Sequence, residues 1–191
     1  DILGKSVSLS QDGNTLAIGA SSPAVGNGYV QVYNYNGSSW VLVGSAITGQ
    51  ALDDNFGYSV SLTDDGSKVA ISARLNDNVN GNNSGQVRVY GYNGSSWIQL
   101  GGNIDGEAAG DQSGWSVSIS GKGEILAISS RHNNGLTGHV RIYRYIDNVW
   151  QFVTEIDGAA ADDQFGYSVA LSGDGRTLSA GAVNSDTVNG T

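Results

Sequence analysis

The chain has 191 residues, enough for one domain with its own core, and a formal net charge of -9 at pH 7. This acidity repels phosphate backbones and anionic lipid surfaces, so we expect neither nucleic acid nor a membrane among the partners. The absence of cysteine excludes disulfides, thiolate metal sites and thiol nucleophiles.

The chain starts at Asp1 and contains no methionine, from which we expect a piece of a longer polypeptide. No segment approaches the roughly 18 apolar residues of a membrane-spanning helix, and no signal segment opens the chain. The 29 glycines cluster with Asn, Ser and Asp between short apolar segments, which is typical of turns between strands.

An internal repeat organises the sequence. The serine of each "SV" pair recurs in steps of 53, 57 and 52 residues, at Ser6, Ser59, Ser116 and Ser168. Tryptophans recur in steps of 57 and 53, at Trp40, Trp97 and Trp150. The period of about 54 is typical of units that bury their apolar faces by stacking on their copies. The predicted repeats cover residues 1–55, 56–112 and 113–164, with a partial fourth repeat, a half-blade, over 165–191.

Each repeat opens with a predicted pair of strands. In the first repeat Val7 and Leu9 lie on one side of a strand, "QDGN" at 11–14 forms a turn, and a second strand continues the apolar side with Leu16 and Ile18. Asp-Gly favours a tight hairpin, because glycine adopts positive φ and the aspartate side chain caps the turn. The expected capping residues are Asp12, Asp65 and Asp174.

A second pair of strands follows a polar loop. The third strand reads "YVQVYNY", "QVRVYGY" or "HVRIYRY", and the fourth carries the repeated tryptophan. In the second repeat Val87 and Val89 lie on one side of the third strand and Tyr90 and Tyr92 on the other, so we expect both sides to be covered. Four-stranded antiparallel sheets covered on both faces by their own copies are β-propeller blades, and this all-β fold is our prediction.

Two short motifs carry a family resemblance. "FGYSV" stands at 56–60 and 165–169, and "AIGA" at 17–20 has its counterpart in "SAGA" at 179–182. The sequence thereby resembles the FG-GAP repeats of integrin α-chain propellers and of large secreted microbial and algal proteins, along the whole chain. This resemblance implies a propeller and a secreted, extracellular or cell-surface location.

The inventory of hairpins is uneven. The first hairpin occurs four times and the second three times, so the chain holds about 3.5 repeats, whereas closed propellers have four or more blades. We therefore expect a segment of a larger propeller or assembly. Its partners would be further repeats of the same polypeptide or other copies of the chain, because an open sheet edge invites association.

The resemblance also raises the question of calcium, which integrin-type repeats often bind in a D-x-[DN]-x-[DN]-G-x-x-D loop. The corresponding positions hold short hairpin turns such as "TDDGS" at 63–67, too short to surround an ion. The loop at 76–85 has asparagines at alternate positions before Gly81, but its one acidic residue, Asp77, falls between them. We therefore expect no resident cofactor.

Acidic residues nevertheless recur just before each "FG" position, at Asp53, Asp54, Asp111, Asp162 and Asp163. Such repetition permits shared cation sites, with calcium as the ion. It equally permits a turn in which the carboxylate accepts backbone N–H bonds. Asp105, Glu107 and Asp157 add acidity to the same connection, so a bound cation is expected there if anywhere.

Other candidate residues are few. His132 and His139 lie in one repeat without recurring partners, so we predict no enzyme. Arg74 and Arg131 share one repeat position, which suits either a carboxylate clamp or ordinary surface arginines. Aromatic residues share another repeat position, at Tyr58, Trp115 and Tyr167. Exposed, these aromatic side chains would stack on a ligand; buried, they would pack between blades.

Four N-x-[ST] sequons lie in glycine-rich predicted turns, at Asn36, Asn82, Asn93 and Asn189. In a secretory chain all four are candidate glycosylation sites, although Asn-Gly alone also explains a type I′ turn.

The leading hypothesis is a non-catalytic structural or adhesive module of a secreted surface, matrix or filament protein. The alternative is a propeller that binds glycans or extracellular proteins through its loops, with calcium as a cofactor. The accessibility of Trp115 distinguishes the two hypotheses.

Overall fold

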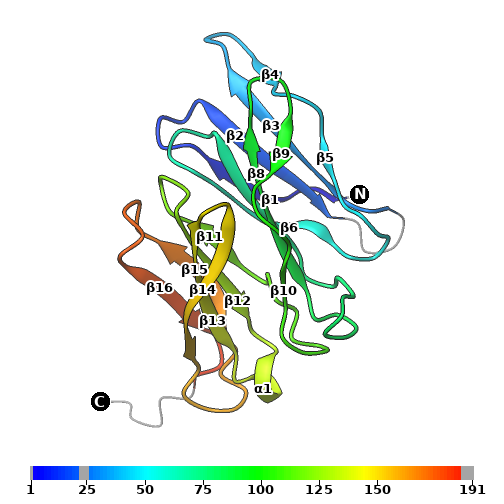
Figure 1. The fold of residues 1–191 in the computed structure, drawn as a ribbon, viewed down its shortest axis with the longest axis vertical. Helices are drawn as coiled ribbons and strands as arrows, with labels where there is room; N and C mark the ends of the chain where they lie inside the picture. Colours follow the sequence, from blue (N-terminus) through cyan, green and yellow to red (C-terminus); the bar gives the residue numbers. More distant parts are fainter. Residues whose placement is uncertain (1, 22–25, 186–191) are drawn as a thin grey trace.

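The computed structural model describes residues 2–21 and 26–185, which form four antiparallel sheets (Figure 1). Blade 1 contains β1 (Ile2–Leu9), β2 (Thr15–Ser21), β3 (Tyr29–Tyr35), β4 (Trp40–Leu42) and β5 (Ile47–Thr48). Blade 2 contains β6 (Phe56–Leu62), β7 (Lys68–Ala73), β8 (Gln86–Tyr92), β9 (Trp97–Gln99) and β10 (Ile104–Asp105). Blade 3 contains β11 (Val117–Ile119), β12 (Ile125–Ser130), β13 (His139–Ile146) and β14 (Val149–Asp157). A fourth unit is the hairpin of β15 (Phe165–Leu171) and β16 (Leu178–Ala182).

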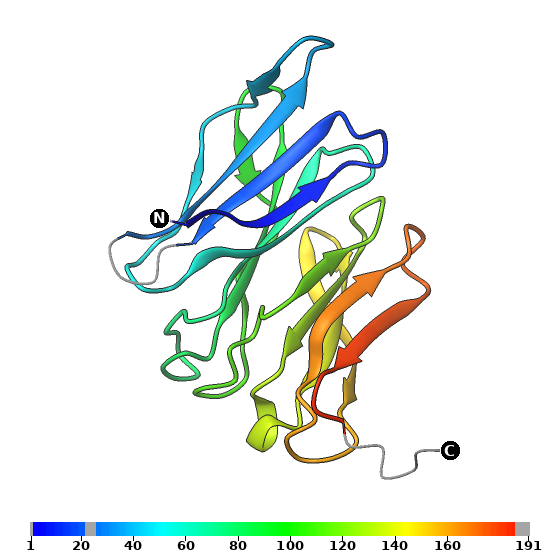
Figure 2. The same cartoon turned by 180° about the vertical axis from the view of Figure 1, so that it is seen from behind.

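The prediction of an all-β protein made of four-stranded antiparallel blades is confirmed. Within the described ranges the only helix is the single turn α1 (Asn133–Leu136), in the connection from β12 to β13. No helix of that part of the chain is long and apolar enough to span a bilayer. The sheets do not close into a ring: β1 and the β15–β16 hairpin lie at the two open ends (Figure 2).

The fourth strand differs from the expectation in blades 1 and 2, where it is broken into two pieces that both pair with the third strand. The breaks contain Gly44 and Gly101, both at positive φ. The tryptophan of the next blade explains them: a Cβ on Gly44 would lie 3.3 Å from Cδ1 of Trp97, and one on Gly101 would lie 3.0 Å from Cδ1 of Trp150. In blade 3 the strand β14 is continuous, with a bulge opposite Ile142 and Tyr143.

The first hairpins turn as the Asp-Gly pairs predict. Oδ1 of Asp12 accepts hydrogen bonds from the Ser10 hydroxyl at 2.6 Å and the Asn14 backbone N–H at 3.0 Å. Asp65 and Asp174 make the same pair of bonds in their hairpins. Lys122 stands at this position in blade 3, where the Ser120 hydroxyl accepts hydrogen bonds from the backbone N–H groups of Glu124 and Ile125. The turn therefore tolerates loss of the aspartate.

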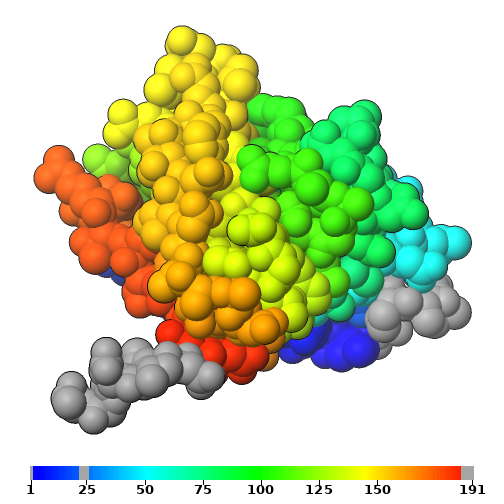
Figure 3. Space-filling view, turned by 90° about the horizontal axis from the view of Figure 1, so that it is seen from below, coloured from blue at the N-terminus to red at the C-terminus, as the bar shows by residue number. Residues whose placement is uncertain are grey.

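The blades pack face to face in chain order, from cyan through green to orange in Figure 3. We call the side of a blade that is turned toward the preceding blade its front face. The front faces of blades 2 and 3 are formed by the same repeat positions: Val60, Leu62, Val69 and Ile71, and Val117, Ile119, Leu126 and Ile128. All eight side chains are buried, at 7% exposure or less. These two interfaces are the core of the molecule.

Polar bonds accompany the apolar contacts between blades. The hydroxyl of Ser8 accepts the backbone N–H of Leu62 at 2.9 Å, and that of Ser61 accepts the N–H of Ile119 at 3.1 Å. The indole N–H of Trp97 donates to the carbonyl of Val43 at 2.9 Å, and that of Trp150 to the carbonyl of Leu100 at 3.1 Å. The repeated serines and tryptophans therefore satisfy backbone groups across the blade interfaces.

Candidate functional site

The recurring aspartates hold the loops that lead into each new blade. Asp54, Asp111 and Asp163 are buried. Oδ2 of Asp54 accepts a hydrogen bond of 2.8 Å from the side-chain amide of Asn76. Oδ2 of Asp111 and Oδ2 of Asp163 each accept a hydrogen bond from the backbone N–H of the residue three positions earlier. Asp53 and Asp162 are exposed and adopt positive φ. Asp111 also accepts a bond of 3.2 Å from the Asn133 amide, so these buried carboxylates act as hydrogen-bond acceptors for the loops, and cation binding at these residues stays a prediction.

The candidate stacking residues come together in one array. The ring centroid of Trp115 lies 5.2 Å from that of Tyr58 and 5.9 Å from that of Tyr167. The guanidinium carbon of Arg131 lies 3.5 Å from the Trp115 centroid and that of Arg74 lies 5.0 Å from it. Cations and aromatic rings thus alternate along the joints of blades 2, 3 and the fourth unit, an arrangement that the quadrupole of the rings favours.

The array is half-buried, and neither arginine in it is an ordinary surface arginine. Trp115 and Tyr58 are half-buried, whereas Tyr167 is 42% exposed. Nη1 of Arg74 and of Arg131 donate to the side-chain oxygens of Gln112 and Gln164, each in the connection that leads to the next unit. Burial lowers the pKa of both arginines. The rings are therefore covered by side chains of the protein itself, and ligand stacking stays a prediction.

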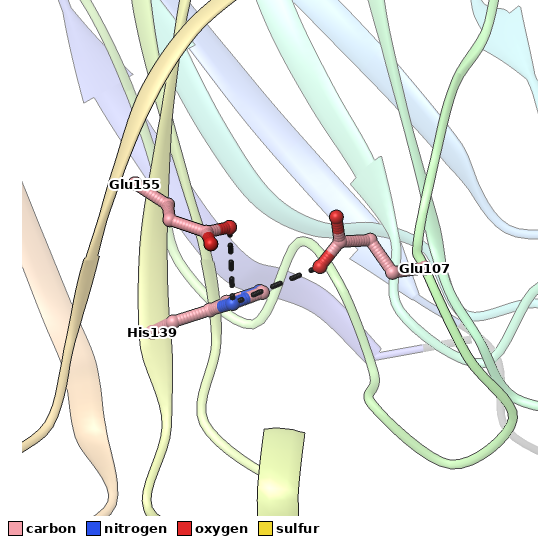
Figure 4. Close-up of side chains that lie close together, drawn as sticks. All are labelled: Glu107, His139 and Glu155. Carbon is pink, nitrogen blue, oxygen red and sulfur yellow. Dashed lines mark ion pairs between the residues drawn. The ribbon is translucent and has the colours of Figure 1, made fainter.

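A second cluster lies at the joint of blades 2 and 3 (Figure 4). It consists of Glu107, in the connection after β10, His139 at the start of β13, and Glu155 in β14. Nδ1 of His139 lies 3.9 Å from Oε2 of Glu107 and 4.0 Å from Oε2 of Glu155. In the described ranges this is the only group of three or more histidine or acidic side chains close enough to hold one metal ion.

Burial and charge act on this cluster in opposite directions. The His139 residue is 2% exposed, and burial, followed by the nearby Arg141 charge, lowers its imidazole pKa, although Glu107, Asp111 and Glu155 act to raise it. Nη1 of Arg141 lies 3.3 Å from Oε1 of Glu107, and its Nη2 donates to the backbone carbonyl of Asp105 at 2.9 Å. Burial thereby favours the neutral imidazole, which lies beside two carboxylates.

The equivalent joint of blades 1 and 2 lacks this cluster. Arg88 occupies the position of Arg141 and is 1% exposed, but Gln50 stands where Glu107 would be and Phe56 where Ser113 is. The guanidinium carbon of Arg88 lies 4.6 Å from the Phe56 centroid, and its Nε and Nη2 have no hydrogen-bond partner in the described ranges. An aromatic ring takes the place of the carboxylate at this joint.

A groove opens between blades 1 and 2 at the end of the hairpin turns. Its volume is about 460 Å³, and its walls include the rings of Tyr92 and Trp97 together with Asn34, Asp65 and Ser67. Aromatic faces beside hydroxyl, amide and carboxylate groups are the usual lining of a small-molecule pocket.

Three of the four sequons can be placed. Asn36, Asn82 and Asn93 are exposed, whereas Asn189 lies outside the described residues. The Oδ1 atoms of Asn36 and Asn93 accept the backbone N–H groups of the following serines at 2.9–3.0 Å, so both cap their turns. In the loop at 76–85, Oδ1 of Asp77 accepts the N–H of Asn83 at 2.7 Å and thereby acts within the loop.

Sequence reasoning singled out Glu107 and its connection for a cation but left His139 without a partner and did not consider Glu155. The missing signal is the register of β13 and β14, which pairs Arg141 with Glu155 and His139 with Asp157. Only that pairing, together with the neighbouring blade, brings the histidine between the two glutamates.

Comparisons with known proteins agree with the fold. Residues 48–90, which include the "FGYSV" of β6, match the model of the FG-GAP repeat. No curated protein matches the sequence. A 6-phosphogluconolactonase candidate from Bacteroides uniformis ATCC 8492 has a similar structure, with a TM-score of 0.62 and 14% identity over 92% of this chain and 46% of that one. TolB from Acinetobacter baumannii has a TM-score of 0.52 and 12% identity over 92% of this chain and 36% of that one.

This chain therefore spans less than half the length of either solved protein. At such identities the likeness concerns the fold alone, which is propeller-like in both. The resemblance to FG-GAP repeats is confirmed for residues 48–90, and the chain carries an FG-GAP repeat within an open, propeller-like array of blades.

Proposed function

We propose that the chain is a non-catalytic structural or adhesive segment of an extracellular repeat protein, joined to further blades at its open ends. One observation carries this proposal: a blade face that is buried at two joints is open at the first blade. The match to the FG-GAP repeat supports the extracellular, adhesive and non-enzymatic parts of the proposal.

The open front face of blade 1 has the same composition as the buried ones. Val7 and Leu9 are 63% and 57% exposed, whereas Val60 and Leu62 at the same repeat positions are 7% exposed. Trp40 is 43% exposed, whereas Trp150 is 8% exposed. A contiguous apolar face of this kind marks a protein interaction surface.

The buried joints indicate what covers this face. Each front face receives the apolar third strand of the preceding blade and serine hydroxyls that accept its backbone N–H groups, as Ser8 does for Leu62. We expect the front face of blade 1 to bind a partner of the same kind. Such a blade would carry serine hydroxyls that accept hydrogen bonds from the backbone N–H groups of Val7 and Leu9. We propose that further repeats of the polypeptide or other copies of the chain supply it.

Light scattering after size exclusion tests this association. We expect the mass to rise with protein concentration while quenching of Trp40 fluorescence by acrylamide falls. The double variant Val7→Asp with Leu9→Asp should remain monomeric, whereas Val79→Asp, at a position 94% exposed in a loop, should associate like the unchanged protein. A chain that stays monomeric at all concentrations, with Trp40 fully quenchable, would contradict the proposal.

The proposed location needs a separate measurement. Antibodies against the chain should label intact cells of the source organism or detect the protein in the medium. Detection solely after lysis would refute the extracellular role.

The groove beside Trp97 favours a second candidate function, binding of a neutral glycan. Sugars stack on aromatic rings and bond to groups such as Asn34 and Asp65, both at the groove. Screening on a glycan array should then give binding that Tyr92→Ala abolishes and Tyr35→Ala, at an exposed ring outside the groove, leaves intact. An array without any bound glycan would rule this function out.

A further inference from the structure

We propose that Glu107, His139 and Glu155 form a binding site for a divalent transition-metal ion, of which zinc(II) fits the donor set best. This site is independent of the proposed association of blades. The sequence by itself led to the expectation of a cation near Glu107, with calcium as the ion. The proposed site holds a different ion and has His139 and Glu155 as its other two ligands.

The donor atoms surround one point without bonding to one another. Nδ1 of His139 lies 3.9 and 4.0 Å from the two carboxylate oxygens, too far for a hydrogen bond to either. All three donor atoms lie within 4.8 Å of one another. With zinc bonds of about 2.1 Å, neighbouring tetrahedral ligands lie about 3.4 Å apart, so the two distances from the histidine to the carboxylates must shorten by about half an ångström.

The burial of the three side chains suits binding of an ion. The His139 side chain is 3% exposed, so its Nδ1 is held at the base of the site by the packing of β13. The side chains of Glu107 and Glu155 are 47% and 43% exposed, so an ion can reach their carboxylates from solvent, and Figure 4 shows both carboxylates directed toward the imidazole. A buried imidazole and two exposed carboxylates form a site that solvent can reach.

The local charge favours a cation despite the neighbouring arginine. Glu107 uses different oxygens for its two neighbours, Oε1 for Nη1 of Arg141 and Oε2 for the His139 side. The arginine thereby orients the carboxylate without occupying the oxygen that faces the ion. The negative charges of Glu107, Asp111 and Glu155 act to raise the pKa of His139, whereas the positive charge of Arg141 acts to lower it.

The donor types identify the ion. Imidazole nitrogen suits zinc and other transition metals, whereas calcium takes six to eight oxygen ligands, more than this site offers. Three protein ligands leave one tetrahedral position for water or for a group of a partner. The ligands belong to two blades, because Glu107 follows β10 whereas His139 and Glu155 belong to β13 and β14. A bound ion would therefore link blade 2 to blade 3.

The site belongs to this joint alone among those described. Gln50 and Ala159 stand at the position of Glu107 in the other connections, and Tyr29 and Gln86 stand at the position of His139. The amide of Gln86 donates to Oδ1 of Asp105 at 2.8 Å and thereby links its strand to β10 directly. That bond lies within blade 2, whereas a metal ion at the next joint would connect blade 2 to blade 3.

Zinc titration by calorimetry, in a buffer without chelators, tests the site. We expect one ion per chain, and a loss of affinity of about tenfold or more in Glu155→Gln. Glu124→Gln, which removes the same charge from an exposed position in blade 3, should bind zinc like the unchanged protein. Glu155 is exposed and makes no hydrogen bond through its side chain in the described ranges, so the variant should fold.

Imidazole NMR identifies the ligand, since the chain has only two histidines. Zinc should shift the ring nitrogens of His139 and leave those of His132 unchanged, and the shift of His139 should persist in the variant His132→Gln. Zinc bound equally well by Glu155→Gln, a shift confined to His132, or no heat of binding would each overturn the proposal.

Discussion

The front faces of blade 1 and blade 2 have nearly the same residues and opposite surroundings. Leu9 and Leu62 occupy the same repeat position in strands of the same kind, yet one side chain is 57% exposed and the other 7%. The hairpins beneath them turn at equivalent aspartates, Asp12 and Asp65. Strand, turn and side-chain direction are thus properties of the repeat, whereas burial depends on the neighbour.

The largest effect that separates the two faces concerns these leucines. Leu62→Ala removes a buried side chain and leaves a cavity, so we expect a loss of about 2–5 kcal/mol in the free energy of unfolding. Leu9→Ala should lower it by less than about 0.5 kcal/mol, because its side chain is exposed. Urea denaturation measures both. Equal losses would mean that the face of blade 1 is also covered in solution.

The serines between blades should give a smaller difference. Ser61→Ala leaves the backbone N–H of Ile119 without its acceptor at a buried joint, so we expect the free energy of unfolding to fall by about 1–3 kcal/mol. Ser168 is exposed on the fourth unit, and Ser168→Ala should lie within about 0.5 kcal/mol of the unchanged protein. Thermal unfolding by circular dichroism compares the two. A neutral Ser61→Ala would show that water replaces the hydroxyl.

The smallest effect concerns the hairpin aspartates and depends on pH. Burial acts to raise the pKa of Asp65, but hydrogen bonds from Ser67 and Thr63 outweigh it and lower the pKa below its usual value of 3.8. The lowered pKa means that the ionised form stabilises the folded state above pH 3.8 and that this contribution disappears as the pH falls through the folded pKa.

Asp65→Asn should therefore reduce stability near neutral pH and flatten its decrease in acid. We expect the free energy of unfolding to fall by well under about 1 kcal/mol, because Asp65 is largely exposed and solvent screens its interactions. Urea unfolding across the acidic range measures the slope, with Lys122→Asn, at the same turn position of blade 3, as the control at a turn without an aspartate. Parallel pH profiles for the unchanged protein and Asp65→Asn would contradict this assignment.

Much of the fold could be predicted because the interactions that build it are local. Alternating residues such as Val7 and Leu9 predict the strands, and Asp-Gly predicts the turns. The broken fourth strand was not predictable from one repeat, because Gly44 accommodates the ring of Trp97 from the next blade. The aromatic array around Trp115 was anticipated as a shared repeat position, but its arginine partners depend on how the blades stack.

The sequence by itself determined the period, the two hairpins of each unit, the turn residues and the apolar sides of the strands, because these features arise from contacts within about fifty residues. The tertiary structure alone decided which of the equivalent faces is buried, and which charged side chains meet. Arg88 lies against Phe56, whereas Arg141 meets Glu107 and His139 lies between two glutamates. The reason is physical: burial and charge pairing depend on atoms far apart in the sequence that meet only when strands pair and blades stack, and a repeat cannot specify its neighbour.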